Sequence, residues 1–296
     1  MKSLKEALLN RPKNIDVARM AAEEYINANY IVNGNLTFEH VKGTYVVDCD
    51  GEIKVANEKI ERLTDGFVWG EVKGSFYCPK CKNLKSLEGA PEYVGEGFSC
   101  RECDMLKSLE GAPREIGGSF FCLYCKNLKT LEGGPEKVND DFDCNSCISL
   151  ESLEGAPKEV GKSFYCDNCD NLKSLEGAPE IINRSFYCTY CHSLTSLEGA
   201  PKYVGGTFDC SKCHSLENLK GAPKEIGEDL NVSGCENLTS LECDTKSVNS
   251  LYTGSCTKLY ITNLENIPEI REGVWGYING NYGHFTQKRL QELYGK

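Results

Sequence analysis

Paired cysteines recur along this chain at a spacing that could bind a metal ion. From Phe76 to Leu219 a unit of 22 residues repeats, and each unit carries Cys-x2-Cys. Two such pairs, 18 residues apart, match the spacing of four-cysteine zinc sites. Zinc binding is therefore the first chemical hypothesis. The two columns of the repeat are Cys78, Cys100, Cys122, Cys144, Cys166, Cys188 and Cys210, and Cys81, Cys103, Cys125, Cys147, Cys169, Cys191 and Cys213.

The less regular units favour a different interpretation, in which cysteine fills interior space. In those units the first column holds Val55, Val232 and Thr253, and valine cannot ligate a metal ion. A free cysteine behaves as a small buried hydrophobe, and its weak S–H group can donate to a backbone carbonyl. We therefore predict buried, reduced thiols and no metal or other cofactor. A zinc-binding structural or storage protein remains the alternative.

No signature of an enzyme accompanies the cysteines. A thioredoxin-like Cys-x-x-Cys needs a helix N-terminus to lower the thiol pKa, whereas these pairs follow a predicted strand. The chain has no phosphate-binding Gly-Lys-Ser/Thr loop, no Gly-x-Ser-x-Gly and no His-Glu-x-x-His. Its histidines are scattered, and we expect a protein that is not an enzyme.

Charge and hydropathy exclude two classes of partner. The 296 residues carry a net charge of -11, which argues against binding a nucleic-acid backbone. No stretch approaches the roughly 18 continuous apolar residues of a membrane span. The N-terminus lacks the apolar core of a signal peptide, so we expect a cytoplasmic protein, a compartment that keeps thiols reduced.

The repeat itself predicts the elements that position the cysteines. A fixed period of this length indicates a solenoid. Phe76 and Cys78 are two residues apart, so on a strand both point inward while Tyr77 points outward. Leu84 and Leu87 supply further inward groups, and Gly-Ala-Pro ends the return path. The predicted fold is a β-rich repeat solenoid with one short parallel strand per 22-residue coil.

The segments at both ends depart from the repeat, and we predict that they cap the solenoid. Residues 1–52 are expected to form an N-terminal cap, with a helix near Leu4, a second helix from Ile15 to Tyr30, and β structure after it. Residues 53–265 are the predicted solenoid. Residues 266–296 form the predicted C-terminal cap, with a short helix that Thr286 begins as N-cap.

The frame Phe-x-Cys-x2-Cys-x2-Leu-x2-Leu-Glu-Gly-Ala-Pro resembles the leucine-rich repeat. Phe76 and Cys78 match its strand positions, Cys81 its Asn/Cys position, and Leu84 and Leu87 the leucines that follow. The frame has one extra residue before Leu84 and one before Phe76. The Ser-Leu-Glu-Gly-Ala-Pro version is also similar to repeat proteins of tailed bacteriophages and some bacteria. That resemblance implies a phage protein that acts inside a bacterial host.

The candidate binding residues are those that vary among coils while the frame stays constant. They occupy the outward strand position and the two positions between the cysteines. Aromatic side chains with acidic neighbours are typical of a binding patch, although tyrosine is also a good strand residue. The candidates are Tyr77, Phe121, Leu123, Tyr124, Asp143, Tyr165, Asp167, Tyr187, Tyr190 and Asp209.

We expect these residues to bind a protein partner without catalysis. From the phage resemblance, the expected partner is a host protein, such as a defence component. One alternative is a protein that sequesters a small ligand such as a nucleotide, which would need a pocket that a flat ladder of strands does not supply. Another is a structural component of a phage particle.

Overall fold

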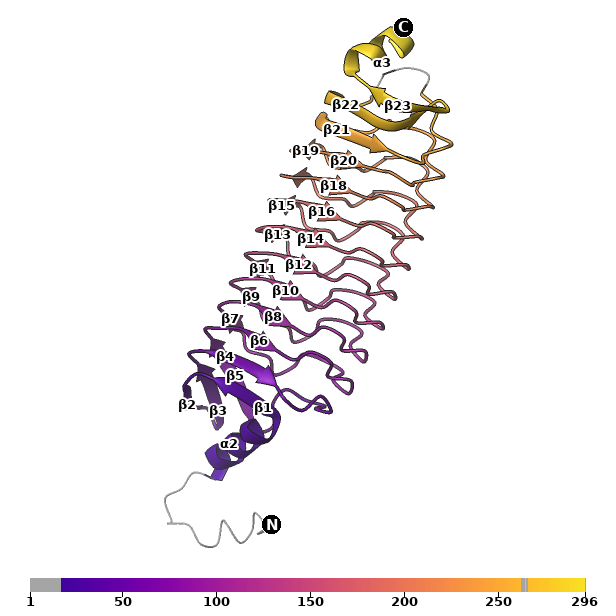
Figure 1. Ribbon diagram of the computed structural model, residues 1–296. Helices are drawn as coiled ribbons and strands as arrows, with labels where there is room; N and C mark the ends of the chain where they lie inside the picture. Colours follow the sequence, from indigo (N-terminus) through magenta and orange to yellow (C-terminus); the bar gives the residue numbers. More distant parts are fainter. Residues whose placement is uncertain (1–16, 262–263, 265, 296) are drawn as a thin grey trace.

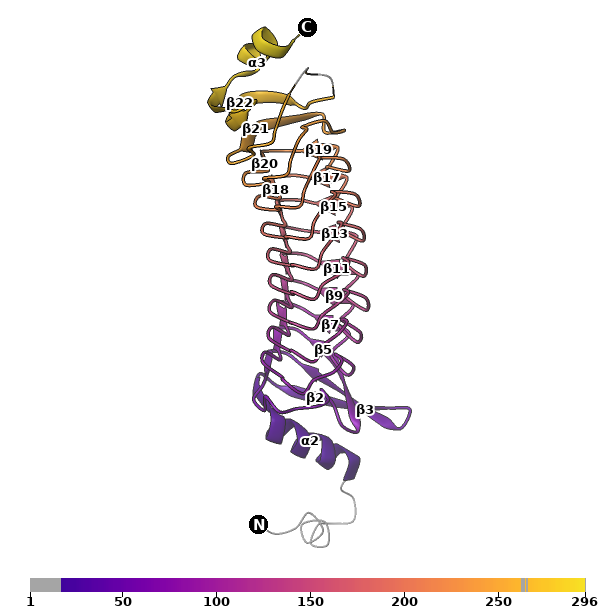
Figure 2. The ribbon, with the colours of Figure 1, turned by 90° about the vertical axis from the view of Figure 1, so that its right-hand side faces the viewer.

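The protein is a column of stacked coils with a helix at each end (Figures 1 and 2). The computed structural model describes residues 17–261, 264 and 266–295. It contains about ten turns with a parallel strand every 22 residues or so, which confirms the predicted solenoid. No helix in the described part of the chain is long and apolar enough to cross a membrane.

Thirteen strands form the first sheet, called sheet A, to which each regular coil contributes two residues. The regular strands pair in parallel and in register, as Phe142 with Phe164 and Asp143 with Tyr165. In spatial order sheet A contains β1 (Tyr30–Asn33), β4 (Glu52–Val55), β6 (Phe76–Tyr77), β8 (Phe98–Ser99), β10 (Phe120–Phe121), β12 (Phe142–Asp143), β14 (Phe164–Tyr165), β16 (Phe186–Tyr187), β18 (Phe208–Asp209), β20 (Leu230–Asn231), β21 (Ser247–Thr253), β22 (Glu269–Ile278) and β23 (Asn281–Phe285).

A second sheet, sheet B, lines another side of the column. It forms where Val94 and its equivalents return to the interior, so each regular coil has a second short strand beside the predicted one. In spatial order sheet B contains β19 (Glu225–Ile226), β17 (Tyr203–Val204), β15 (Ile181–Ile182), β13 (Glu159–Val160), β11 (Lys137–Val138), β9 (Glu115–Ile116), β7 (Tyr93–Val94), β5 (Phe67–Val72), β3 (Thr44–Cys49) and β2 (Leu36–Val41).

Both ends of the column are closed by antiparallel strands and a helix. At the N-terminal end, β1 pairs antiparallel with β4, and α2 (Val17–Asn29) carries the buried residues Ala22 and Ile26. The helix predicted near Leu4 lies outside the described residues. At the C-terminal end, β23 pairs antiparallel with β22. The helix α3 (Gln287–Tyr294) begins after Thr286, whose side chain accepts from the Arg289 N–H group, as predicted for an N-cap.

The interior of the column is a set of identical side chains stacked coil upon coil. Successive phenylalanines from Phe76 to Phe208 are fully buried and stack with ring centroids 5.0 to 5.7 Å apart and interplanar angles of 4 to 18°. Leu84, Leu87 and their equivalents are also fully buried. The backbone adds hydrogen bonds between coils, such as Phe142 N–H to Ser163 C=O at 3.0 Å. Each coil therefore buries its apolar face only against its neighbours.

Truncation of one stacked ring tests this packing. Phe164→Ala should lower the free energy of unfolding by about 3–5 kcal/mol, because it removes a fully buried ring and leaves a cavity. Phe164→Leu should lose only about 1 kcal/mol, since Leu230 occupies the same position in a later coil. Urea unfolding of both variants, followed by circular dichroism, measures the difference. Equal midpoints for the two variants would contradict the stacked core.

Candidate functional site

The second cysteine column forms a ladder of thiol hydrogen bonds. From Cys103 onward, each thiol of this column donates to the carbonyl of the first-column residue one coil earlier, with S···O distances of 3.1 to 3.5 Å. The ladder runs from Cys103, bonded to the Cys78 carbonyl, to Cys256, bonded to the Val232 carbonyl. Val232 fills the same position with an aliphatic group, so the first column needs only a backbone carbonyl and side-chain volume, although the Cys144 and Cys166 thiols also donate to the Tyr165 and Tyr187 carbonyls at 3.3 and 3.4 Å. These are the contacts that the packing interpretation expects.

The chemistry of these thiols follows from their burial. All the cysteines are free, and all except the half-buried Cys243 are buried. Burial raises the pKa of the first-column thiols Cys122, Cys144 and Cys166 well above the usual value. Cys103 in the second column is the exception, because hydrogen bonding with Cys78 and Cys81 lowers its pKa to about 4. A protonated thiol is a poor nucleophile and a poor metal ligand. Among the residues that the structure describes, no three Cys, His, Asp or Glu side chains are grouped so as to hold a metal ion.

The outward positions of sheet A place six of the ten candidate residues in one column. Tyr77, Phe121, Asp143, Tyr165, Tyr187 and Asp209 lie on strands joined by in-register pairing. The rings of Tyr165 and Tyr187 stack with centroids 5.1 Å apart. Leu123 and Asp167 lie two residues beyond this column, next to their cysteines. These eight side chains therefore share one surface, called here the sheet A face.

Tyr124 and Tyr190 occupy a different position, the turn that follows each strand. Their backbones are left-handed, with φ of 60° and 58°, and Gly234 holds the same place in a later coil. A left-handed backbone costs a residue other than glycine about 1–2 kcal/mol. Tyr124 is 50% exposed and lines a separate depression with Lys82 and Lys126. These two tyrosines flank the sheet A face and do not belong to it.

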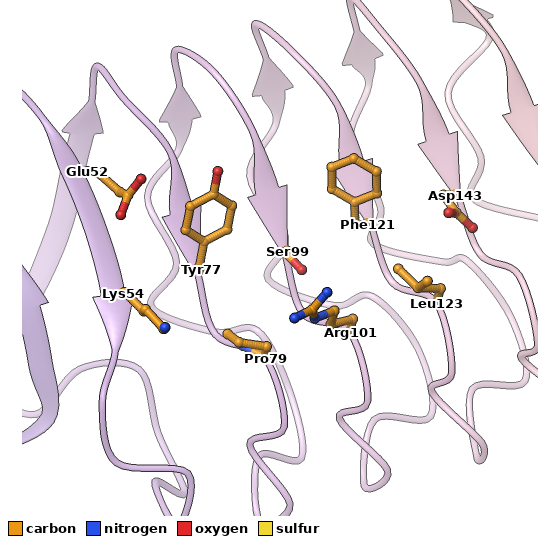
Figure 3. A pocket seen from close by; sticks show the side chains of 9 residues that line it. All are labelled: Glu52, Lys54, Tyr77, Pro79, Ser99, Arg101, Phe121, Leu123 and Asp143. Atoms are coloured by element: carbon orange, nitrogen blue, oxygen red, sulfur yellow. The ribbon is translucent and has the colours of Figure 1, made fainter.

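A groove of about 490 Å³ crosses the N-terminal part of the sheet A face (Figure 3). Ser99 is small and 94% buried, and it lies between the larger side chains of Tyr77 and Phe121, which leaves a hollow above it. Pro79, Arg101 and Leu123 form a second row beside these three in the picture. The groove is lined by Glu52, Lys54, Tyr77, Pro79, Ser99, Arg101, Phe121, Leu123 and Asp143.

From Asp143, at one end of the groove, the sheet A face carries partly buried carboxylates. Burial, helped by nearby Asp167 and Asp141, raises the pKa of Asp143 to about 6, although a hydrogen bond from the Asn145 N–H group opposes the shift. Burial also raises the pKa of Asp167, which accepts hydrogen bonds from the Thr189 N–H and O–H groups at 2.7 Å. Like charges held close in a partly dry surface destabilise the free protein. A cationic group of a partner would relieve that repulsion.

Several residues of this face were not among the predicted ones. Ser99 and Arg101 occupy variable positions of the repeat but were not predicted as binding residues. A small or a charged residue becomes notable only when the side chains beside it in the adjacent coils are known. Trp275, 46% exposed, continues the outward column through its pairing with Tyr252 and stacks on His284 with centroids 3.9 Å apart. The tail around Trp275 departs from the frame, so the repeat gave no signal there.

Comparison with known proteins does not assign this chain to a family. No protein-family model matches the chain, and neither the curated proteins nor the solved structures include a significant match.

Replacement of one ladder thiol tests its role as a donor. Cys147→Ala should destabilise the protein by about 1–3 kcal/mol, because it leaves the buried Cys122 carbonyl without the thiol bonded to it at 3.2 Å. Cys147→Ser keeps a donor at that position and should lose about 1 kcal/mol less than alanine. Thermal unfolding of the two variants provides the comparison. If Cys147→Ser is no more stable than Cys147→Ala, the thiols of the ladder contribute volume alone.

The raised pKa of Asp143 predicts a pH-dependent stability. The folded protein binds this proton more tightly than the unfolded chain, whose aspartate has a pKa of about 4. Asp143 therefore lowers stability as pH rises from about 4 to about 6, which is the sign expected for a raised carboxyl pKa. Asp143→Asn should melt at a higher temperature than the wild type at pH 7 and at the same temperature near pH 4.

The exposed carboxylate of Asp170 supplies the control for loss of one negative charge. Asp170→Asn should leave the melting temperature nearly unchanged at both pH values. A melting difference for Asp143→Asn that is constant from pH 4 to pH 7 would contradict the raised pKa.

Proposed function

We propose that this protein is a non-catalytic binding protein that holds a protein partner on the sheet A face. The observation that carries the proposal is the stacked pair Tyr165 and Tyr187, which lies between the partly buried carboxylates Asp143 and Asp209 on one continuous surface. Tyrosine provides a large contact area at low entropic cost, and tyrosines are common among the residues that dominate binding energy.

The energetics of this face support a role beyond folding. Asp143 and Asp167 have pKa values raised by burial, so their charged forms destabilise the free protein. Residues that reduce stability are expected where function requires them. The carboxylates favour a partner that brings basic side chains to β12–β18, since pairing would stabilise both charges.

The resemblance of the repeat to phage proteins bears on the partner. A phage protein of this kind would act in the cytoplasm of a bacterial host and bind a host protein, for which a defence component is the natural candidate. The net charge of -11 agrees with a partner that has a basic surface.

A double substitution on the sheet A face tests the proposal. Tyr165→Ala/Tyr187→Ala should weaken binding of the captured host protein at least tenfold, because two central aromatic contacts are lost. The partner is first captured from host lysate on the immobilised wild type, then purified and titrated calorimetrically against each variant. Tyr190→Gly adds a flanking test, since Gly234 shows that the coil accepts glycine there.

Sheet B offers a matched control for this double substitution. Ile181 and Tyr203 occupy outward positions on adjacent coils and are each 40% exposed. Ile181→Ala/Tyr203→Ala should bind the partner as tightly as the wild type. If the control loses binding while the sheet A double variant keeps it, the partner binds another surface and the proposal is wrong.

A further inference from the structure

The groove above Ser99 differs in charge from the rest of the sheet A face. Lys54 and Arg101 line it, and within the described part of the chain neither has an ion-pair partner. By contrast, Asp143, Asp167 and Asp209 dominate the coils that follow. The face therefore changes from a part with free cations to an acidic part within a few coils.

Arg101 has surroundings that suit a carboxylate. Its neighbours in the second row are Pro79 and Leu123, both apolar, and Ser99 lies beside it (Figure 3). A guanidinium group binds a carboxylate through two parallel hydrogen bonds, and an apolar rim strengthens such bonds by excluding water. The only carboxylates lining the groove in the described structure, Glu52 and Asp143, lie at its two ends. Glu52 disfavours a ligand carboxylate at the end of the groove that holds Lys54, and Asp143 disfavours one at the other end, which leaves Arg101 as the favoured position.

The walls of the groove suit an apolar group next to that carboxylate. Tyr77 and Phe121 stand on either side of Ser99, and the hollow between them is open to solvent. An open trough on a sheet buries only one side of a small molecule, whereas ligand pockets bury most of their ligand. A protein segment, by contrast, is held in place by the rest of the interface.

We infer that this groove binds an acidic-aromatic segment of the partner, with an Asp or Glu carboxylate on Arg101 and the adjacent aromatic side chain above Ser99. This inference rests on the proposed function and adds the orientation in which the partner binds. The acidic segment lies over β6–β10, and the basic part of the partner lies over β12–β18. The partner can then dock in one orientation, because reversal would place like charges together.

Short blocked peptides added to the full chain test the inference without knowledge of the partner. The probes are acetyl-Gly-Glu-Phe-Gly-amide and its Gln and Lys counterparts, titrated while amide and arginine N–H resonances are recorded by NMR. The Glu peptide should shift the resonances of Ser99 and Arg101 and bind at least fivefold more tightly than the Gln peptide. Arg101→Gln should abolish that preference.

A cation on sheet B provides the matched control for loss of one positive charge. Lys137 is exposed on β11, and Lys137→Gln should retain the preference for the Glu peptide. Equal affinity for the Glu and Gln peptides, or loss of the preference in the control, would overturn the inference. The inference would also be overturned if 3-phenylpropionate bound as tightly as the Glu peptide, because the groove would then be a site for small organic anions.

These outcomes are separable from those of the proposed function. If the peptides show no preference while Tyr165→Ala/Tyr187→Ala still loses the host protein, the groove inference alone fails. If the Glu peptide binds at Arg101 but the double variant keeps its partner, the assignment of the partner to the tyrosine pair fails.

Discussion

Every coil of this protein must present the same interior profile to the coils before and after it. Backbone groups of adjacent coils are hydrogen-bonded in register, so in the regular coils phenylalanine stacks on phenylalanine and a thiol meets a carbonyl. Parallel strands lie about 4.8 Å apart, so one column accepts only side chains that fill a similar space, such as Leu230 in the phenylalanine column and Val232 in the first cysteine column. The thiol ladder and the ring stack follow from this requirement. The residues at the two ends differ because they close the column against solvent.

A uniform interior leaves the outward positions free to vary. On the sheet A face the chain places a partly buried carboxylate at Asp143 and stacked rings at Tyr165 and Tyr187, and in the turns it places tyrosines with a left-handed backbone at Tyr124 and Tyr190. The carboxylate and the left-handed residues lower stability locally. The stacked core offsets the loss, since each regular coil from Phe76 to Leu219 buries two leucines, a phenylalanine and two thiols. This division between a repetitive interior and a varied face is the basis of the proposed binding function.

The sequence predicted the coil because its period and the inward pair Phe76 and Cys78 are local signals. Sheet B was not predicted, because a two-residue strand such as Tyr93–Val94 has no alternation by which it could be recognised. The groove could not be predicted, because the hollow at Ser99 exists only between Tyr77 and Phe121, which lie 22 residues away on either side. Whether a cation such as Arg101 lacks an ion-pair partner likewise depends on side chains from several coils.

The central claim is that the cysteines fill space and donate hydrogen bonds without holding metal. The most direct measurement combines a thiol titration with elemental analysis on protein purified without chelator, folded and unfolded, with and without EDTA. We expect no stoichiometric metal, an unfolding midpoint that EDTA does not change, and rapid reaction of the half-buried Cys243 alone until unfolding exposes all 18 thiols. Several bound metal ions per chain, together with a midpoint lowered by EDTA, would contradict the account.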